Sequence, residues 1–484
     1  MIMLACIALS SLDFVQQEIP GNFYTSFGFL EQQGAGVRRA DFDGDGANDL
    51  VMDQGIAFQR NGRYAVADVE PLPTWPTDYH WDLWHATLYV RTLGKLDLFR
   101  WETGWQHVLS QELVWPAKDV FTQQDFPPRR FLFDINNDDD PEIIVPGEDG
   151  LHVYTRGERW YYEASLLDVY PSVFLTEDPA QPVWPVERRA WRFPSLGARP
   201  TLWMQGGFIH VLQDAPTGDG RLRYATTRYS IDASTFRLRD EQPERRNQGT
   251  VPPTFKPCFL NPGDTVDFVE YQQAATSASA VPKPVYRASI STDGGNTFQS
   301  FQTVGFSPHT LFVDYNRDDR LDLVLCGTDL FDGGIRETAL RFLTGTYVTH
   351  EIRIHLQDER NQFSTTPDII GRFSIAFEER PWFESRRFLK YRSSGLVNLD
   401  GDFNGDGYHD ACVAEKPREI RIYYGGKEGF EPKPSHILKT EEESFPEVAD
   451  IDGDGRYDVC ARTMGSPTQD GAAGVLFLNR ETKP

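Results

Sequence analysis

Short apolar segments alternate with acidic segments along this chain. Apolar runs at residues 50–52, 143–145 and 323–325 each follow directly on a stretch rich in aspartate. Further along, apolar and polar residues alternate up to a glycine-containing turn, as in residues 150–157. Alternation with a period of two that ends in a turn is typical of β-strands. The pattern predicts a repeated unit of strand, acidic loop, strand, turn and strand.

The acidic segment nearest the C-terminus is a run of nine residues with acids at positions one, three, five and nine. These acids are Asp450, Asp452, Asp454 and Asp458, and glycines fill positions four and six. When a chain wraps around a point, alternate side chains face that point, and Ca²⁺ takes six to eight oxygen ligands. Glycine permits the positive φ angles of such a wrap. Because four carboxylates this close repel one another, the run predicts a cation site.

Four further runs share this spacing, and they begin at Asp41, Asp134, Asp314 and Asp402. The run at Asp41 matches the C-terminal run closely, and the run at Asp402 has an asparagine at position three. The runs at Asp134 and Asp314 keep the acids and lose the glycines. In the Asp134 run Asn137 and Asp139 replace them, and both residue types tolerate left-handed geometry.

The helix-loop-helix calcium hand is the main alternative for such runs, and it requires a bidentate glutamate at position twelve. Position twelve is apolar in all five runs: Met52, Val145, Leu325, Val413 and Ala461. The residues after each loop also have the pattern of a strand. The sequence therefore excludes the calcium hand.

The repeat spacing predicts an all-β fold. The last two runs begin 48 residues apart, and the longer gaps are expected to contain units that have lost their acids, at residues 83–107, 196–211 and 261–269. Repeats of this kind stack as radial sheets, which predicts a single β-propeller of seven or eight blades. Residues 330–395 exceed one unit, so a strand-rich insertion is expected there. A segment at residues 22–30 is expected to supply the last strand and close the ring.

These runs and their flanking strands resemble the FG-GAP/VCBS repeat family, the propeller repeat also found in integrin α-subunits. The resemblance spans most of residues 35–480. It implies a propeller with three to five structural Ca²⁺ ions, held by side chains at positions one, three, five and nine and by the carbonyl of position seven. The implied ligands are Asp41, Asp43, Asp45, Ala47 and Asp49; Asp134, Asn136, Asp138, Asp140 and Glu142; Asp314, Asn316, Asp318, Arg320 and Asp322; Asp402, Asn404, Asp406, Tyr408 and Asp410; and Asp450, Asp452, Asp454, Arg456 and Asp458.

A different motif occupies residues 291–298. Its serine, aspartate, glycine, threonine and phenylalanine match the Asp-box of sialidase-like propellers. In that motif the aspartate bonds amides of its own turn, with the aromatic ring packed below. The resemblance implies a structural hairpin rather than a glycosidase site.

Six of the 11 tryptophans lie close together in the sequence: Trp75, Trp81, Trp84, Trp101, Trp105 and Trp115. One interpretation is a stacking platform for a sugar or a partner protein. The other, which we favour, is aromatic packing between blades.

Charge and composition narrow the partners and the compartment. The net charge of −24 argues against nucleic acid as a partner. The five cysteines have no metal-binding spacing and are expected to be small buried apolar residues. No segment after residue 12 is apolar for long enough to span a membrane. Residues 1–12 are apolar without a basic start, so residues 1–20 are either an incomplete signal peptide or an N-terminal strand, and the propeller is expected over residues 21–484.

Two functions remain open from the sequence. The first is an exported, calcium-stabilised monomer, extracellular, periplasmic or at the cell surface, that binds a protein or a polysaccharide without chemistry of its own. The second is a polysaccharide lyase with a cleft on one face of the propeller. No GxSxG, HExxH, GxGxxG or P-loop motif is present, and no catalytic residue can be assigned. We therefore favour the binding module.

Overall fold

The computed structural model describes residues 12–19, 38–52, 55–61, 63–64, 69–73, 80–92, 94–115, 131–134, 138–147, 150–165, 174–176, 201–205, 208–232, 237–238, 244–252, 255–258, 260, 267–276, 284–304, 306–328, 347–376, 396–441, 443–452, 454–463 and 474–481. Every regular element within these segments is a β-strand. They include no helix long and apolar enough to cross a membrane. The all-β prediction is confirmed over this part of the chain.

The first half of the chain forms four successive sheets. The first contains β2 (Arg38–Ala40), β3 (Asp49–Met52) and β4 (Gly55–Ala57), followed by a hairpin of β5 (Gln59–Arg60) and β6 (Arg63–Tyr64). The second contains β7 (His80–Trp84), β8 (Thr87–Thr92), β9 (Lys95–Trp101) and β10 (Trp105–Glu112). The third contains β11 (Leu132–Phe133), β12 (Glu142–Gly147), β13 (Gly150–Arg156) and β14 (Trp160–Ser165). The fourth contains β15 (Phe174–Thr176), β16 (Thr201–Gln205), β17 (Phe208–Pro216), β18 (Leu222–Asp232), β19 (Arg237–Leu238) and β20 (Glu244–Val251).

Four more sheets follow in the second half. The fifth contains β21 (Lys256–Cys258), β22 (Asp267–Thr276), β23 (Pro284–Ser291) and β24 (Gln299–Val304). The sixth contains β25 (Phe306–Val313), β26 (Asp322–Thr328), β27 (Tyr347–His355) and β28 (Ile369–Ala376). The seventh contains β29 (Val397–Gly401), β30 (Asp410–Lys416), β31 (Glu419–Tyr423) and β32 (His436–Lys439). The eighth contains β33 (Ser444–Ala449), β34 (Asp458–Thr463) and β35 (Gly474–Glu481), with β1 (Leu12–Ile19) as its fourth strand.

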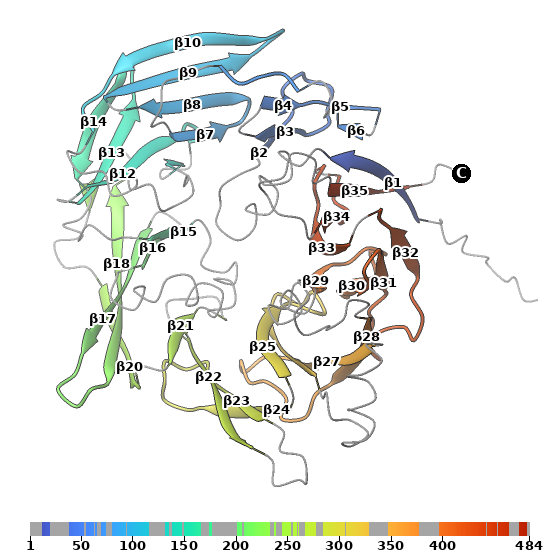
Figure 1. The fold of residues 1–484 in the computed structure, drawn as a ribbon. Helices are drawn as coiled ribbons and strands as arrows, with labels where there is room; N and C mark the ends of the chain where they lie inside the picture. The colour runs from blue at the N-terminus through green and yellow to red at the C-terminus, as the bar shows by residue number, and fades with distance from the viewer. Residues whose placement is uncertain are drawn as a thin grey trace, which may run out of the picture.

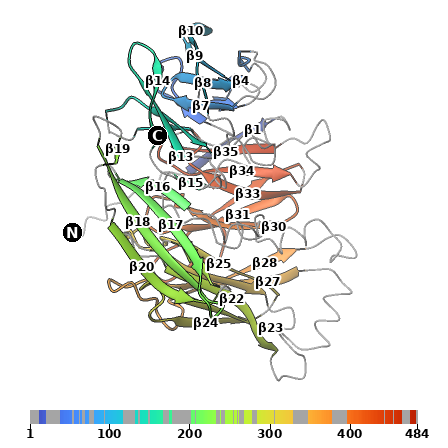
Figure 2. The same ribbon diagram turned by 90° about the vertical axis from the view of Figure 1, so that its left-hand side faces the viewer.

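The sheets follow one another around a common centre (Figure 1). The first strand of a sheet lies on the inner side, as β7 and β25 do, and the last strand lies on the outer side, as β10 and β28 do. Neighbouring strands pair antiparallel except β15 and β16, which pair parallel. The fourth sheet is the irregular one: β18 lies between the long strands β17 and β20 (Figure 2) and also pairs with β19.

The two ends of the chain meet in the eighth sheet. β1 pairs antiparallel with β35 along its whole length, from Leu12 opposite Glu481 to Ile19 opposite Gly474. The first sheet also packs on the eighth, because Leu50 shares a core cluster with Leu476. An N-terminal strand therefore completes the sheet begun by the C-terminal residues.

The predicted closing segment was placed too far along the chain. The strand that pairs with β35 is β1, whereas residues 22–30 lie outside the described residues. β1 has four polar residues among its eight, so no dense apolar run marks it as a strand in the sequence. β1 also lies within residues 1–20, for which the sequence left a signal peptide and an N-terminal strand open. Residues 12–19 of that segment form a strand.

The predicted insertion contains two regular strands of the sixth sheet. β27 pairs with β26 and β28 pairs with β27, so both belong to the sixth sheet. Within residues 330–395 the structure describes residues 347–376, and the expected insertion in the other residues stays a prediction. The units expected without acids correspond to the second, fourth and fifth sheets.

Apolar side chains fill the spaces between adjacent sheets. The largest core cluster joins the sixth, seventh and eighth sheets and includes Ile352, Val413 and Phe477. Cys326, Cys412 and Cys460 are buried and free, as the small-apolar interpretation predicts. Cys6 lies outside the described residues.

The pairing of β1 with β35 predicts that β1 is needed for stability. Deleting residues 1–19 leaves β35 as an open edge and removes Phe14, whose ring lies 6.1 Å from that of Phe403 in the seventh-sheet loop. We expect the melting temperature to fall by roughly 5 °C or more. Deleting only residues 1–11 is the matched control and is expected to leave it unchanged. Coincident melting curves for both truncations would contradict this role of β1.

Candidate metal centres

The five acidic loops occupy the same place in their sheets. Each loop connects the first strand to the second: β2 to β3, β11 to β12, β25 to β26, β29 to β30 and β33 to β34. The repeated unit predicted from the sequence is therefore one repeated hairpin.

The loops share one backbone conformation. In the loops at Asp41 and Asp402 the glycines at positions four and six have φ between 71° and 90°. Residues with side chains adopt the same left-handed angles elsewhere: Asp139 has φ 70°, Arg317 has φ 52° and Asp319 has φ 63°. Replacement of the glycine by Asp139 is thus confirmed, and Asn137 lies outside the described residues.

The first acid of each loop organises this wrap through backbone amides. Asp402 Oδ1 accepts the amides of Gly405 and Asp406 at 2.7 and 3.2 Å, and its Oδ2 accepts that of Gly407 at 3.0 Å. The acid at position five accepts the amide of position seven, as Asp406 does from Tyr408 at 2.9 Å. Aspartates that bond amides a few residues ahead favour such turns locally, so the sequence sets the loop shape.

The ninth acid has a different environment, because it is fully buried. Asp410 Oδ2 accepts the amide of Phe403 at 2.7 Å, and Oδ1 accepts that of Gly425 at 2.6 Å. Phe403 is position two of the loop, and Gly425 follows the third strand, β31. The same pair of bonds recurs at Asp49, Asp322 and Asp458, at 2.8–3.0 Å. The ninth acid therefore fastens the loop to the end of the third strand.

We call the buried ninth acid with its two amide bonds the clip, and one of these bonds remains where the rest of the loop is lost. Asp267, at the start of β22, is fully buried and accepts the amide of Leu260 at 2.7 Å. Glu142, which replaces the ninth aspartate in the third sheet, is also buried. This position serves the fold independently of a complete acid set.

Burial raises the pKa of the ninth acids. It raises the pKa of Asp322 and Asp410 to about 7 and that of Asp49 to about 6, although the amide donors act in the opposite direction. The pKa of Asp458 is also raised, chiefly by burial and then by Asp452. A positive charge in the loop favours the ionised carboxylate and so opposes both effects.

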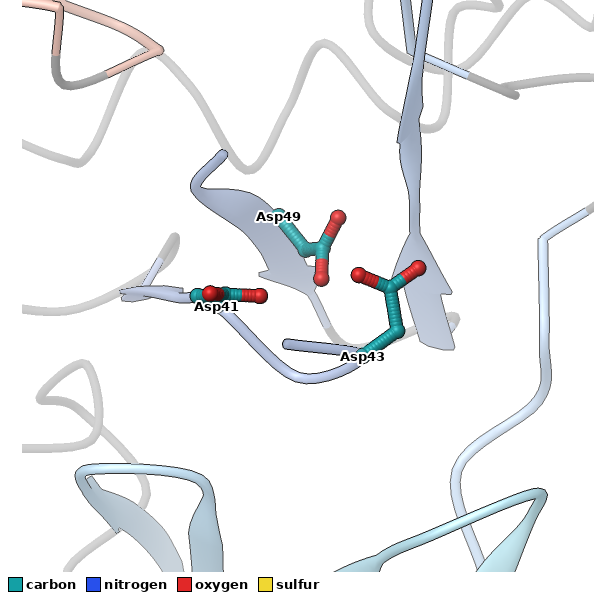
Figure 3. A group of neighbouring side chains, drawn as sticks. All are labelled: Asp41, Asp43 and Asp49. Atoms are coloured by element: carbon teal, nitrogen blue, oxygen red, sulfur yellow. The ribbon is translucent and has the colours of Figure 1, made fainter. Parts of the chain in front are cut away.

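Two loops bring three carboxylates together. Asp41, Asp43 and Asp49 each present an oxygen within 4.8 Å of the others (Figure 3). In the eighth sheet Asp450, Asp452 and Asp454 do the same. These are the groups of three acids found within the described residues.

The remaining loops offer different ligand sets. In the Asp402 loop position three is Asn404, whose amide nitrogen donates to Asp406 Oδ2 at 3.0 Å. In the Asp314 loop the guanidinium of Arg320 donates to Asp318, which places a positive charge on a predicted ligand. In the Asp134 loop Asn136 lies outside the described residues.

Side chains from neighbouring sheets dock on the loops. Arg317 of the Asp314 loop lies 3.3 Å from Asp402 of the next loop and donates to the hydroxyl of Tyr457 at 3.2 Å. The indole of Trp84 donates to the carbonyl of Asp139 at 3.0 Å. The loops are thus part of the contact between adjacent sheets.

Arginines also contact the two loops that have an aspartate at each of positions one, three, five and nine. Arg60 is ion-paired with Asp43 and lies 3.5 Å from Asp45. Arg480 lies 2.5 Å from Asp452 and 3.5 Å from Asp454. The sequence interpretation missed both arginines. The signal that identifies them is a shared apolar–amide–arginine order at residues 58–60 and 478–480.

The tryptophans pack between sheets. Trp105 of the second sheet lies 5.8 Å from Phe42 of the first, and Trp115 lies 4.9 Å from Tyr154 of the third, measured between ring centroids. The packing interpretation is confirmed for these residues, and Trp75 lies outside the described residues.

The Asp-box forms the predicted hairpin between β23 and β24. Asp293 Oδ1 accepts the amides of Asn296 and Thr297 at 3.0 and 2.9 Å. Partial burial alone would raise the pKa of Asp293, but these bonds and those from the Thr297 and Ser291 hydroxyls lower it below its usual value. The ring of Phe298 packs on Phe255 at 4.9 Å.

Comparisons with known proteins place a repeat on two of these loops. Residues 402–461 match the family described as FG-GAP-like repeat, a span that contains the loops at Asp402 and Asp450. A solved structure of Hsv2 from Kluyveromyces lactis with a complete loop 6CD aligns with 84% of this chain and 99% of its own, at a TM-score of 0.34 and 10% identity. Likeness at that level bears on neither fold nor function. The search of curated proteins gave no match.

The two kinds of acid predict different responses to amide substitution. Asp410→Asn replaces one accepting oxygen by an NH₂ group that opposes a buried amide donor, so we expect a loss of roughly 1–3 kcal/mol in unfolding free energy. Asp406→Asn, in the exposed part of the same loop, keeps an oxygen for Tyr408 and is expected to cost less than about 0.5 kcal/mol. Urea unfolding in chelator at pH 8 measures both. Equal losses would contradict the clip assigned to the ninth acid.

Proposed function

We propose that this chain is a calcium-stabilised β-propeller of eight blades that acts as an exported interaction module. The observation that carries the proposal is the recurrence of one hairpin loop, with the same wrap and the same buried clip, in successive small sheets. The FG-GAP-like repeat at residues 402–461 supports it, because that repeat contains two of these loops.

Eight sheets around a common centre support the eight-bladed propeller. Each has three or more strands over the described residues, and the N-terminal strand β1 completes the eighth. The hydroxyl of Tyr64 donates to the carbonyl of Ile451 at 3.3 Å, which joins the first and eighth sheets. Closure by strands from both ends of the chain leaves only short, protected sheet edges.

The loop residues fit Ca²⁺. Asp41, Asp43 and Asp49 offer converging hard oxygens, which is the donor set that Ca²⁺ prefers. Although Asp49 already accepts two amides, a carboxylate has about four lone-pair sites and keeps capacity for a ligand bond. Bound Ca²⁺ would supply positive charge that offsets the repulsion among the acids of each loop.

Calcium would therefore be a structural element of the fold. The implied ions, three to five in number, sit in hairpins that contact neighbouring sheets, so binding is linked to the packing of the ring. Such loops load more readily at extracellular than at cytosolic calcium levels, which favours an exported protein. The loops that join strands at the ends of the ring are then available to contact a protein or a carbohydrate.

Calcium is expected to raise thermal stability. A site at 100 times its dissociation constant adds about 2.7 kcal/mol if the unfolded chain does not bind. Calorimetric scans in calcium and in chelator, at matched ionic strength, should differ by several degrees. Equal midpoints would refute structural calcium.

A binding screen tests the interaction role. The calcium-loaded protein is expected to bind a member of a panel of anionic glycans, neutral glycans and extracellular proteins, and to lose that binding in chelator. New ultraviolet absorbance from an anionic polysaccharide would instead identify the unsaturated product of a lyase and would overturn the assignment as a module without chemistry.

A further inference from the structure

Arg60 and Arg480 occupy equivalent places in their sheets. Residue ten of the first loop, Leu50, pairs with Ala57, and Arg60 lies three residues further on. Residue ten of the last loop, Val459, pairs with Phe477, and Arg480 again lies three residues further on. Each arginine therefore lies the same number of residues beyond the partner of residue ten, Arg60 in β5 and Arg480 in β35.

The two arginines contact the same two positions of their loops. Each lies against the acids at positions three and five, which are Asp43 and Asp45 for Arg60 and Asp452 and Asp454 for Arg480. The side chain of Asp452 is 1% exposed and that of Arg480 is 24% exposed. The corresponding exposures at the first loop are 19% for Asp43 and 49% for Arg60. The pair in the eighth sheet is thus the more strongly shielded from solvent.

The other loops have no arginine at this place. The same register leads to Gly157, Asp358 and Gly426 in the third, sixth and seventh sheets. The two loops with an aspartate at each of positions one, three, five and nine are the two that carry the guanidinium. The arginine accompanies the loops in which position three is an acid.

We infer that Arg60 and Arg480 are resident counter-cations that keep the Asp41 and Asp450 loops folded without metal and weaken their affinity for calcium. This inference rests on the proposed calcium binding. A guanidinium paired with positions three and five neutralises part of the loop charge. A Ca²⁺ ion that binds the loop must displace the guanidinium from the same oxygens. The calcium affinity therefore reports the difference in binding free energy between Ca²⁺ and the guanidinium. Arg480 should weaken calcium affinity more than Arg60 does, because buried charges are screened less than exposed ones.

The experiment compares Arg60→Met and Arg480→Met with wild type in calcium titration calorimetry. Methionine keeps the apolar stem and removes the charge. We expect affinity for calcium to rise at least fivefold at the Asp41 loop and at least tenfold at the Asp450 loop, with a lower melting temperature in chelator. Arg60→Lys and Arg480→Lys keep the charge and should restore affinities near wild type. Arg223→Met is the matched control, because Arg223 is an exposed residue of β18 in a sheet without an acidic run.

Terbium gives a local readout for the first loop. Trp105 packs on Phe42, the second residue of that loop, so excitation of tryptophan should sensitise terbium bound there. Tighter terbium binding in Arg60→Met, absent from Arg480→Met, assigns the change to the loop that Arg60 contacts.

The outcomes separate the inference from the proposed function. Tighter binding in the methionine variants, including binding that wild type lacks, supports the inference. Calcium binding with equal affinity in wild type and variants overturns it and leaves the proposed function standing. No binding by any of these proteins overturns both.

Discussion

A buried carboxylate joins two segments of the repeat in four of the eight sheets. Asp49, Asp322, Asp410 and Asp458 each accept one amide from the start of the acidic loop and one from the end of the third strand. A buried carboxylate whose two oxygens each accept an amide hydrogen bond holds the loop in one position and orientation relative to its sheet. Leaving a buried amide unpaired would cost free energy. Loops held in this way contact neighbouring sheets, as Arg317 does at Asp402 and Tyr457.

The same arrangement brings several carboxylates close together, and more than one kind of positive charge can compensate their repulsion. Burial raises the pKa of the ninth acids, and the other loop acids stand close by. A divalent cation is one source of compensating charge, and arginine is another: Arg60 and Arg480 approach from their own sheets, and Arg317 reaches Asp402 from the preceding loop. Different arginines therefore contact different loops, and Arg320 contacts Asp318 within the Asp314 loop.

Much of the fold could be predicted from the sequence, because the repeat is local. Residue spacing within nine positions identifies the loops, and glycine or Asp139 at the left-handed positions follows from backbone sterics. Pairings between distant residues could not be predicted in the same way. The match of β1 with β35 depends on which strand reaches an open edge, and the pairing of β26 with β27 joins strands that are far apart in the sequence. The contacts of Arg60 and Arg480 required the strand register, although their apolar–amide–arginine order is visible in the sequence.

The most direct test is a crystal structure of the protein grown in calcium, with anomalous data collected at long wavelength. The result expected is an anomalous peak inside the loops at Asp41, Asp402 and Asp450, with the ninth carboxylates still bonded to both amides and the two arginines moved off positions three and five. Loops without anomalous peaks, or ninth carboxylates turned away from their amides, would contradict the link between the buried clip and a cation-binding ring.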